Sequence, residues 1–130
     1  MQTADLRAMF FTERSRFAAK YPACGSATLT IVRSRCPPTT PDCTGRNVAW
    51  CYPDTARVYI LARALKLSRS NLTALLRHEL AHIACPPCSE ARTDALASRV
   101  GGRKIRYDAR EIQTLASRAR YPRRPAHLPR

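Results

Sequence analysis

The fold is decided by residues 70–100, which read SNLTALLRHELAHIACPPCSEARTDALASRV. Apolar side chains recur in the first half of this stretch at the spacing of one helix face, namely Leu72, Leu75, Leu76, Leu80 and Ile83. Ser68 or Ser70 precedes them and can cap the first turn with its hydroxyl. This half therefore predicts an amphipathic helix.

The second half of the stretch predicts a second helix. Pro86 and Pro87 force a turn after the first helix, because the residue before a proline avoids the helical conformation. Residues 89–100 then continue without proline or glycine until Gly101 and Gly102, which are suited to a helix C-terminus. Because so short a connection favours antiparallel neighbours, the two helices are expected to form a hairpin.

The first helix carries the run His78-Glu79-Leu80-Ala81-His82. Residues four apart lie on one helix face, so His78 and His82 project toward a common point, where they can bind one metal ion. Glu79 is rotated by about 100 degrees from His78, beside the metal rather than on it, which is the position of a general base. A solvated helix face that happens to contain this pattern is the alternative interpretation.

A catalytic zinc normally has three protein ligands, and the predicted hairpin offers Glu90 as the third. In an antiparallel hairpin Glu90 lies next to His82, and Asp94, one turn further on, lies level with His78. Asp94 is then expected to hold the other ring nitrogen of His78. Ordinary acidic residues in the first turn of a helix are the alternative explanation for both.

Residues 78–94 resemble the zincin metallopeptidases, particularly the gluzincin pattern HExxH followed by ExxxD, with a connector of only seven residues between His82 and Glu90. The resemblance implies one Zn²⁺ per chain, with His78, His82 and Glu90 as ligands. It also implies that a strand before the motif helix binds peptide substrate as an added strand. The residues expected in that edge strand are Arg57, Val58, Tyr59, Ile60 and Leu61.

The cysteines leave a second assignment open. Cys88 occupies the place of the third histidine in the HExxHxxGxxH pattern of metzincins, and a thiolate there would bind zinc tightly. Alternatively, Cys85 and Cys88 form a local disulfide across the turn, or remain a thiol pair. The spacing of Cys36, Cys43 and Cys51 does not match a standard zinc finger, so disulfides or buried thiols are expected for them.

The rest of the chain completes a small α+β domain over residues 1–120. We expect a helix at 3–20, a strand at 27–33, a stiff loop at 36–45, a strand hairpin at 47–52 and 57–61, and a C-terminal helix that starts at Asp108. The sheet is expected to have about three strands and to be mostly antiparallel. Residues 121–130 are basic and rich in proline, and we expect a mobile tail.

The composition is that of a folded protein with a strong positive charge. Lys and Arg number 23 against nine Asp and Glu, for a formal net charge of +14. Such a chain can attract nucleic acid or an anionic cell-wall polymer. No signal peptide and no membrane span are recognised, and a cytoplasmic or virion-associated location, of bacterial or phage origin, is expected.

Taken together, these features predict a zinc metallopeptidase that hydrolyses peptide bonds of a peptide or protein substrate with zinc-activated water and Glu79 as general base. The alternative is a basic structural or interaction module, associated with nucleic acid or a phage particle, that metal or disulfides stabilise. Glu79 separates the two, because a purely structural metal site needs no carboxylate at the general-base position.

Overall fold

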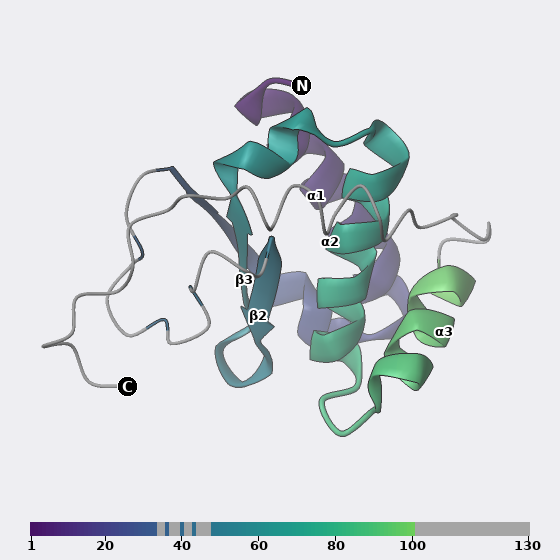
Figure 1. Cartoon of the computed structure of the whole chain (residues 1–130). Coiled ribbons are helices and arrows are strands. Elements are labelled where there is room, and N and C mark those ends of the chain that lie inside the picture. The colour runs from purple at the N-terminus through teal and green to yellow at the C-terminus, as the bar shows by residue number, and fades with distance from the viewer. Residues whose placement is uncertain (34–35, 37–39, 41–42, 44–47, 101–130) are drawn as a thin grey trace, which may run out of the picture.

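Figure 1 shows the computed structural model of the chain, which describes residues 1–33, 36, 40, 43 and 48–100. In these residues, helices pack against a small mixed sheet, which confirms the predicted α+β class. The α-helices are α1 (Thr3–Lys20), α2 (Arg69–Ala84) and α3 (Glu90–Val100). Short 3₁₀ turns connect other elements: η1 (Pro22–Ser26), η2 (Pro53–Thr55) and η3 (Ala62–Lys66).

Helix α1 forms where the sequence predicts it. Its first turn is stabilised at Gln2, whose backbone N–H donates a hydrogen bond to the Asp5 carboxylate at 3.1 Å. Its buried face consists of side chains at helical spacing, Leu6, Met9, Phe10, Glu13 and Phe17. The helix ends at Lys20, because Tyr21 precedes Pro22 and such a residue favours extended backbone.

The sheet contains β1 (Thr28–Val32), β2 (Ala49–Tyr52) and β3 (Arg57–Leu61) in the order β1-β3-β2. Strands β2 and β3 form the predicted hairpin, and Ala56, with φ of 52°, provides the left-handed residue that closes it. β1 pairs with the other side of β3 and runs parallel to it. The sheet is therefore mixed, not mostly antiparallel, because one of its two strand pairings is parallel.

Helix α2 lies at the centre of the fold. In Figure 1 it stands between the sheet and α3, with α1 behind it, and it contacts α1, α3, β2 and η1. The main core fills the space between these elements, and its largest fully buried side chains include Leu6, Phe17, Ile60, Leu72, Leu76 and Leu80. Burial on several sides fixes the rotation of α2, and with it the direction of its polar residues.

The sheet face away from α2 has a second cluster, formed by Val32, Cys43, Trp50, Tyr59 and Leu61. The rings of Trp50 and Tyr59 stack with their centroids 5.7 Å apart. A disulfide joins Cys36 to Cys43. This agrees with the expectation of disulfides or buried thiols for Cys36, Cys43 and Cys51. Both faces of the sheet are thus covered by apolar side chains.

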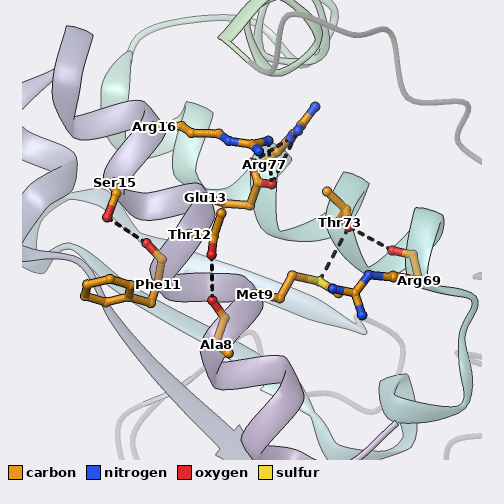
Figure 2. Close-up of polar contacts among 10 residues, drawn as sticks. All are labelled: Ala8, Met9, Phe11, Thr12, Glu13, Ser15, Arg16, Arg69, Thr73 and Arg77. Atoms are coloured by element: carbon orange, nitrogen blue, oxygen red, sulfur yellow. Dashed lines mark hydrogen bonds and ion pairs between the residues drawn. The ribbon is translucent and has the colours of Figure 1, made fainter.

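A buried ion pair joins α1 to α2 (Figure 2). The Nε of Arg77 lies 2.8 Å from one carboxylate oxygen of Glu13, and a terminal nitrogen of Arg77 lies 3.3 Å from the other. Both side chains are about 5% exposed, and Arg16, at the surface, approaches the same carboxylate at 3.3 Å. The contact holds the two helices in one relative position.

Some expectations lie outside the described residues. They are most of the stiff loop at 36–45, the helix end at Gly101 and Gly102, the helix from Asp108 and the tail at 121–130. Among the residues that are described, none of the helices has the length and apolar character that crossing a lipid bilayer requires.

Candidate metal centre

Helix α2 presents the two motif histidines to one point. The helix begins at a cap in which the Ser68 hydroxyl accepts a hydrogen bond from the backbone N–H of Asn71 at 3.3 Å. Its leucines face the core, so His78 and His82 lie on the side toward α3. The Nε2 atoms of the two rings are 3.0 Å apart. The pair is therefore arranged as two ligands for one ion.

Helix α3 adds the third side chain. The turn before it is closed by a disulfide between Cys85 and Cys88, and the Ser89 hydroxyl accepts a hydrogen bond from the backbone N–H of Arg92 at 3.3 Å. Glu90 is the first residue of the helix, and its carboxylate oxygens lie 2.9 Å from His78 Nε2 and 3.2 Å from His82 Nε2. The predicted position of Glu90, beside the last turns of α2, is confirmed.

Asp94 lies one turn further along α3. Its Oδ1 is 2.6 Å from Nδ1 of His78, which is the contact that the sequence predicts. An ionised carboxylate can only accept, so with Asp94 ionised Nδ1 of His78 keeps its proton and donates a hydrogen bond to Oδ1. In neutral His78 the lone pair is then on Nε2, the atom that faces His82 and Glu90.

The convergence of acceptor atoms fits a cation. His78 Nε2, His82 Nε2 and a carboxylate oxygen of Glu90 all lie within 4.8 Å of one another and could hold a metal ion. Without a proton or a metal ion between them, these lone pairs would repel each other. The two histidine side chains are about 20% exposed and that of Glu90 is 74% exposed, so an ion can reach the group from solvent.

Glu79 differs from Glu90 in its surroundings. It lies on α2 next to His78, and only 6% of it is exposed. Burial raises the pKa of Glu79 to about 7, the proximity of Glu90 acts in the same direction, and the charge of His78 and a hydrogen bond from the Cys51 thiol oppose the rise. A carboxylate with this pKa can take up and release a proton near neutral pH.

Burial also affects His82. The pKa of His82 is lowered, first by loss of water around the ring and then by the nearby charge of His78, although Glu90 and Asp94 act in the opposite direction. The ring therefore stays neutral over a wider pH range. A neutral imidazole is the form that binds metal ions.

The structure overturns the alternative ligand Cys88. Its sulfur is bonded to Cys85, and a sulfur in a disulfide is not a thiolate that can bind zinc. The prediction of Cys88 as third ligand is therefore wrong, whereas the local disulfide across the Pro86-Pro87 turn is confirmed. The disulfide connects Cys85, the residue after α2, to Cys88, which lies two residues before Glu90.

The predicted edge strand is also wrong. Residues Arg57, Val58, Tyr59, Ile60 and Leu61 form β3, which pairs with β1 on one side and with β2 on the other. Both sets of its backbone groups are used within the sheet, so β3 cannot accept an added strand. Among the described strands, β1 and β2 are the ones at the edges.

The sequence did not reveal the contact between Cys51 and Glu79. Cys51 lies on β2, packs toward the main core and donates a hydrogen bond from its thiol to the Glu79 carboxylate. It is one of the two cysteines outside the disulfides, with Cys24 as the other. The alternation of side chains along residues 49–52 signals which face Cys51 occupies, but it does not reveal what lies opposite.

The chain matches no protein-family model, no curated protein and no solved structure. Its function is therefore inferred from its own residues and their geometry.

Proposed function

We propose that this chain is a zinc-dependent metallopeptidase with His78, His82 and Glu90 as metal ligands and Glu79 as general base. The observation that carries the proposal is the approach of two imidazole nitrogens and one carboxylate to within 4.8 Å, directly beside a buried second carboxylate. Two histidines and one glutamate form a ligand set of catalytic zinc sites, which leave a coordination position open. A structural zinc site would use four protein ligands instead.

The donor atoms favour zinc for this site. Imidazole nitrogens suit zinc better than calcium or magnesium, which prefer sites made of oxygen atoms alone. Asp94 supports the assignment, because it fixes the proton of His78 on Nδ1 and leaves Nε2 as the ligand atom. The lowered pKa of His82 works in the same direction, since the ring need not lose a proton before it binds.

The chemistry divides between the ion and the chain. Zinc, when bound, supplies a Lewis acid that polarises the substrate carbonyl and makes water more acidic. Glu79 accepts the proton from the attacking water and later passes it to the leaving amine. A pKa raised to about 7 suits both steps, because the group can gain and lose the proton at the same pH.

The outer edge of β2 is the place we propose for the substrate backbone. The β1 edge is partly used by α1, since the Arg7 guanidinium donates to the Leu29 carbonyl at 3.3 Å. Strand β2 contacts α2, and its Cys51 reaches Glu79, so an extended peptide paired with β2 would pass close to the general base. A peptide whose backbone nitrogens are methylated should bind at least about tenfold more weakly than its parent, because it loses about one or two hydrogen bonds.

The decisive experiment measures metal content and hydrolysis on the same samples. Protein purified without reductant, so that both disulfides are kept, is loaded with one equivalent of zinc, dialysed and analysed by mass spectrometry. His82→Ala and Glu90→Ala should lose the zinc. Glu79→Gln should retain one zinc per chain and lose hydrolysis of fluorescein-labelled casein, because it preserves the ligands and removes the base. Asp94→Asn should retain zinc with affinity lower by about 10–100-fold.

Two results would contradict the proposal. Wild-type protein that binds no zinc would remove the metal centre. Zinc-loaded protein whose casein hydrolysis is unaffected by Glu79→Gln would show that any activity comes from another site or from a contaminating protease.

A further inference from the structure

The thiol of Cys51 is a polar group beside the general base that the proposed mechanism does not use. Cys51 lies on β2, outside both disulfides, and is partly buried against the core face of the sheet. Its thiol donates a hydrogen bond to the Glu79 carboxylate. The contact joins residues 28 positions apart in the sequence, one on a strand and one on the central helix.

The strand makes Cys51 a fixed donor. Cys51 is paired with Val58 of β3, and the neighbouring residues on both sides are also paired, so the backbone that carries the thiol is held within the sheet. Glu79 lies on the opposite wall of the same interior, on a helix whose rotation is set by packing. A donor and an acceptor that are both held in this way keep one mutual orientation.

Orientation matters for a buried carboxylate that must exchange a proton. A glutamate side chain has three rotatable bonds, and in a largely apolar environment little else directs its end group. If one oxygen accepts the hydrogen bond from the Cys51 thiol, the other oxygen is left to meet a water molecule near His78, His82 and Glu90. The arrangement resembles the use of an additional residue to hold a catalytic base in place.

We propose that Cys51 is a positioning residue for Glu79: its thiol holds one carboxylate oxygen so that the other is directed toward the group formed by His78, His82 and Glu90. This role rests on the proposed metallopeptidase function. In this proposal β2 has two roles. Its outer edge would pair with the substrate backbone, and the inward side chain of Cys51 would orient the base Glu79.

The first test compares two variants of zinc-loaded protein. Cys51→Ser keeps a hydrogen-bond donor, whereas Cys51→Ala removes it, and both should retain one zinc per chain. With fluorescein-labelled casein, Cys51→Ala should lower kcat by about tenfold with little change in KM, the factor that corresponds to the loss of one hydrogen bond to a charged group. Cys51→Ser should stay within about threefold of wild type, because its hydroxyl replaces the lost donor.

The order of the two variants separates positioning from packing. If Cys51 only filled space, alanine would be tolerated as well as or better than serine, because serine brings an unneeded hydroxyl into apolar surroundings. Activity of Cys51→Ala equal to or above that of Cys51→Ser would therefore overturn the proposal. The expected order is wild type, then serine, then alanine.

A second test does not depend on activity. The S–H stretching band in the infrared spectrum of metal-free protein reports the strength of the hydrogen bond that a thiol donates. At a pH well above 7, where Glu79 is ionised, Glu79→Gln should move the Cys51 band to higher frequency, because a neutral amide oxygen is a weaker acceptor than a carboxylate. Cys24, whose thiol donates to the Leu80 carbonyl with a sulfur–oxygen distance of 3.5 Å, should keep its band and serve as the reference.

The two tests distinguish the two possible failures. Casein hydrolysis by wild type together with an unmoved Cys51 band would overturn the role of Cys51 alone. Absence of hydrolysis in zinc-loaded wild type would overturn the proposed function, and with it the catalytic purpose of the Cys51 contact.

Discussion

At the scale of single residues, two glutamates of the same site have opposite surroundings. Glu79 is 6% exposed, whereas the side chain of Glu90 is 74% exposed. Burial penalises the charged form of Glu79, whereas the Glu90 carboxylate is open to solvent next to the histidines. These different environments fit the proposed roles, proton transfer for Glu79 and binding of a cation for Glu90.

The buried carboxylate predicts a pH dependence of stability in metal-free protein. Burial raises the pKa of Glu79 from 4.5 to about 7, so the folded state binds the proton more tightly than the unfolded state does. The free energy of unfolding that this group contributes is therefore greatest below pH 4.5, falls as the pH rises to 7 and stays low above it. Urea unfolding at a series of pH values measures this change.

Glu79→Gln provides the matched comparison, because glutamine is neutral throughout. Relative to wild type, the variant should gain about 3 kcal/mol in the free energy of unfolding between pH 4.5 and pH 8, a value deduced from the change in pKa. Titration of all other groups is common to both proteins and cancels. A difference between the two proteins that stays constant with pH would show that Glu79 is not held in a desolvating environment.

At the scale of elements, the proposed metal centre depends on how α1 holds α2. Arg77 immediately precedes His78, and its guanidinium is bound by Glu13 of α1 through contacts of 2.8 and 3.3 Å. Met9 of α1 also contacts Thr73, one turn earlier on α2 (Figure 2), where the hydroxyl and the sulfur are 3.5 Å apart. The orientation of the motif helix is thus also set by its contacts with α1.

Removal of Glu13 should be costly. Glu13→Ala leaves the Arg77 guanidinium buried without its carboxylate, and we expect it to lower the free energy of unfolding by about 3–5 kcal/mol. Arg16→Ala is the control, because Arg16 contacts the same carboxylate from the surface, with half of its side chain exposed, and should cost at most about 1 kcal/mol. Thermal or urea unfolding of the three proteins measures both values. If Glu13→Ala and Arg16→Ala lowered the free energy of unfolding equally, the buried contact between Glu13 and Arg77 would stabilise the fold no more than the surface contact does.

Local sequence signals predicted the α-helices of the described residues, the strand hairpin and the proximity of most of the candidate site's side chains. Caps, prolines and the spacing of apolar residues are contained within each element, and His78, His82, Glu90 and Asp94 lie on two helices joined by a short turn. Strand order was not predictable in the same way, because it depends on which edges meet after the chain has folded back. For that reason β3 was mistaken for an edge strand.

The same limit applies to contacts between distant residues. Glu13 and Arg77 are 64 positions apart, and Cys51 meets Glu79 only because β2 packs on α2. No periodicity within one element signals either pair. The choice between a disulfide and a thiolate at Cys88 also needed the positions of both sulfur atoms, since the spacing permits either.

At the scale of the whole molecule, the dominant property is positive charge. The chain has a formal net charge of +14, and within its described residues Arg77 is the only buried cationic side chain. The other described Lys and Arg side chains are therefore in contact with solvent. The acidic residues of the site, Glu90 and Asp94, are exposed as well, so a local negative group lies on a molecule that is positive overall.

This charge predicts salt-dependent binding to polyanions that is independent of the metal centre. Duplex DNA and heparin should both bind at low salt, since each basic side chain that contacts an anionic group releases a condensed counterion. If six to ten such contacts form on DNA, the affinity should fall by about 10³–10⁵ between 50 and 200 mM salt, which fluorescence anisotropy of a labelled duplex can follow. Glu79→Gln alters the proposed base and should follow the same salt dependence as wild type. Weak binding that does not vary with salt would exclude the electrostatic mechanism, whereas a steep dependence shared by both proteins would mean that polyanion binding is electrostatic and does not require the proposed base.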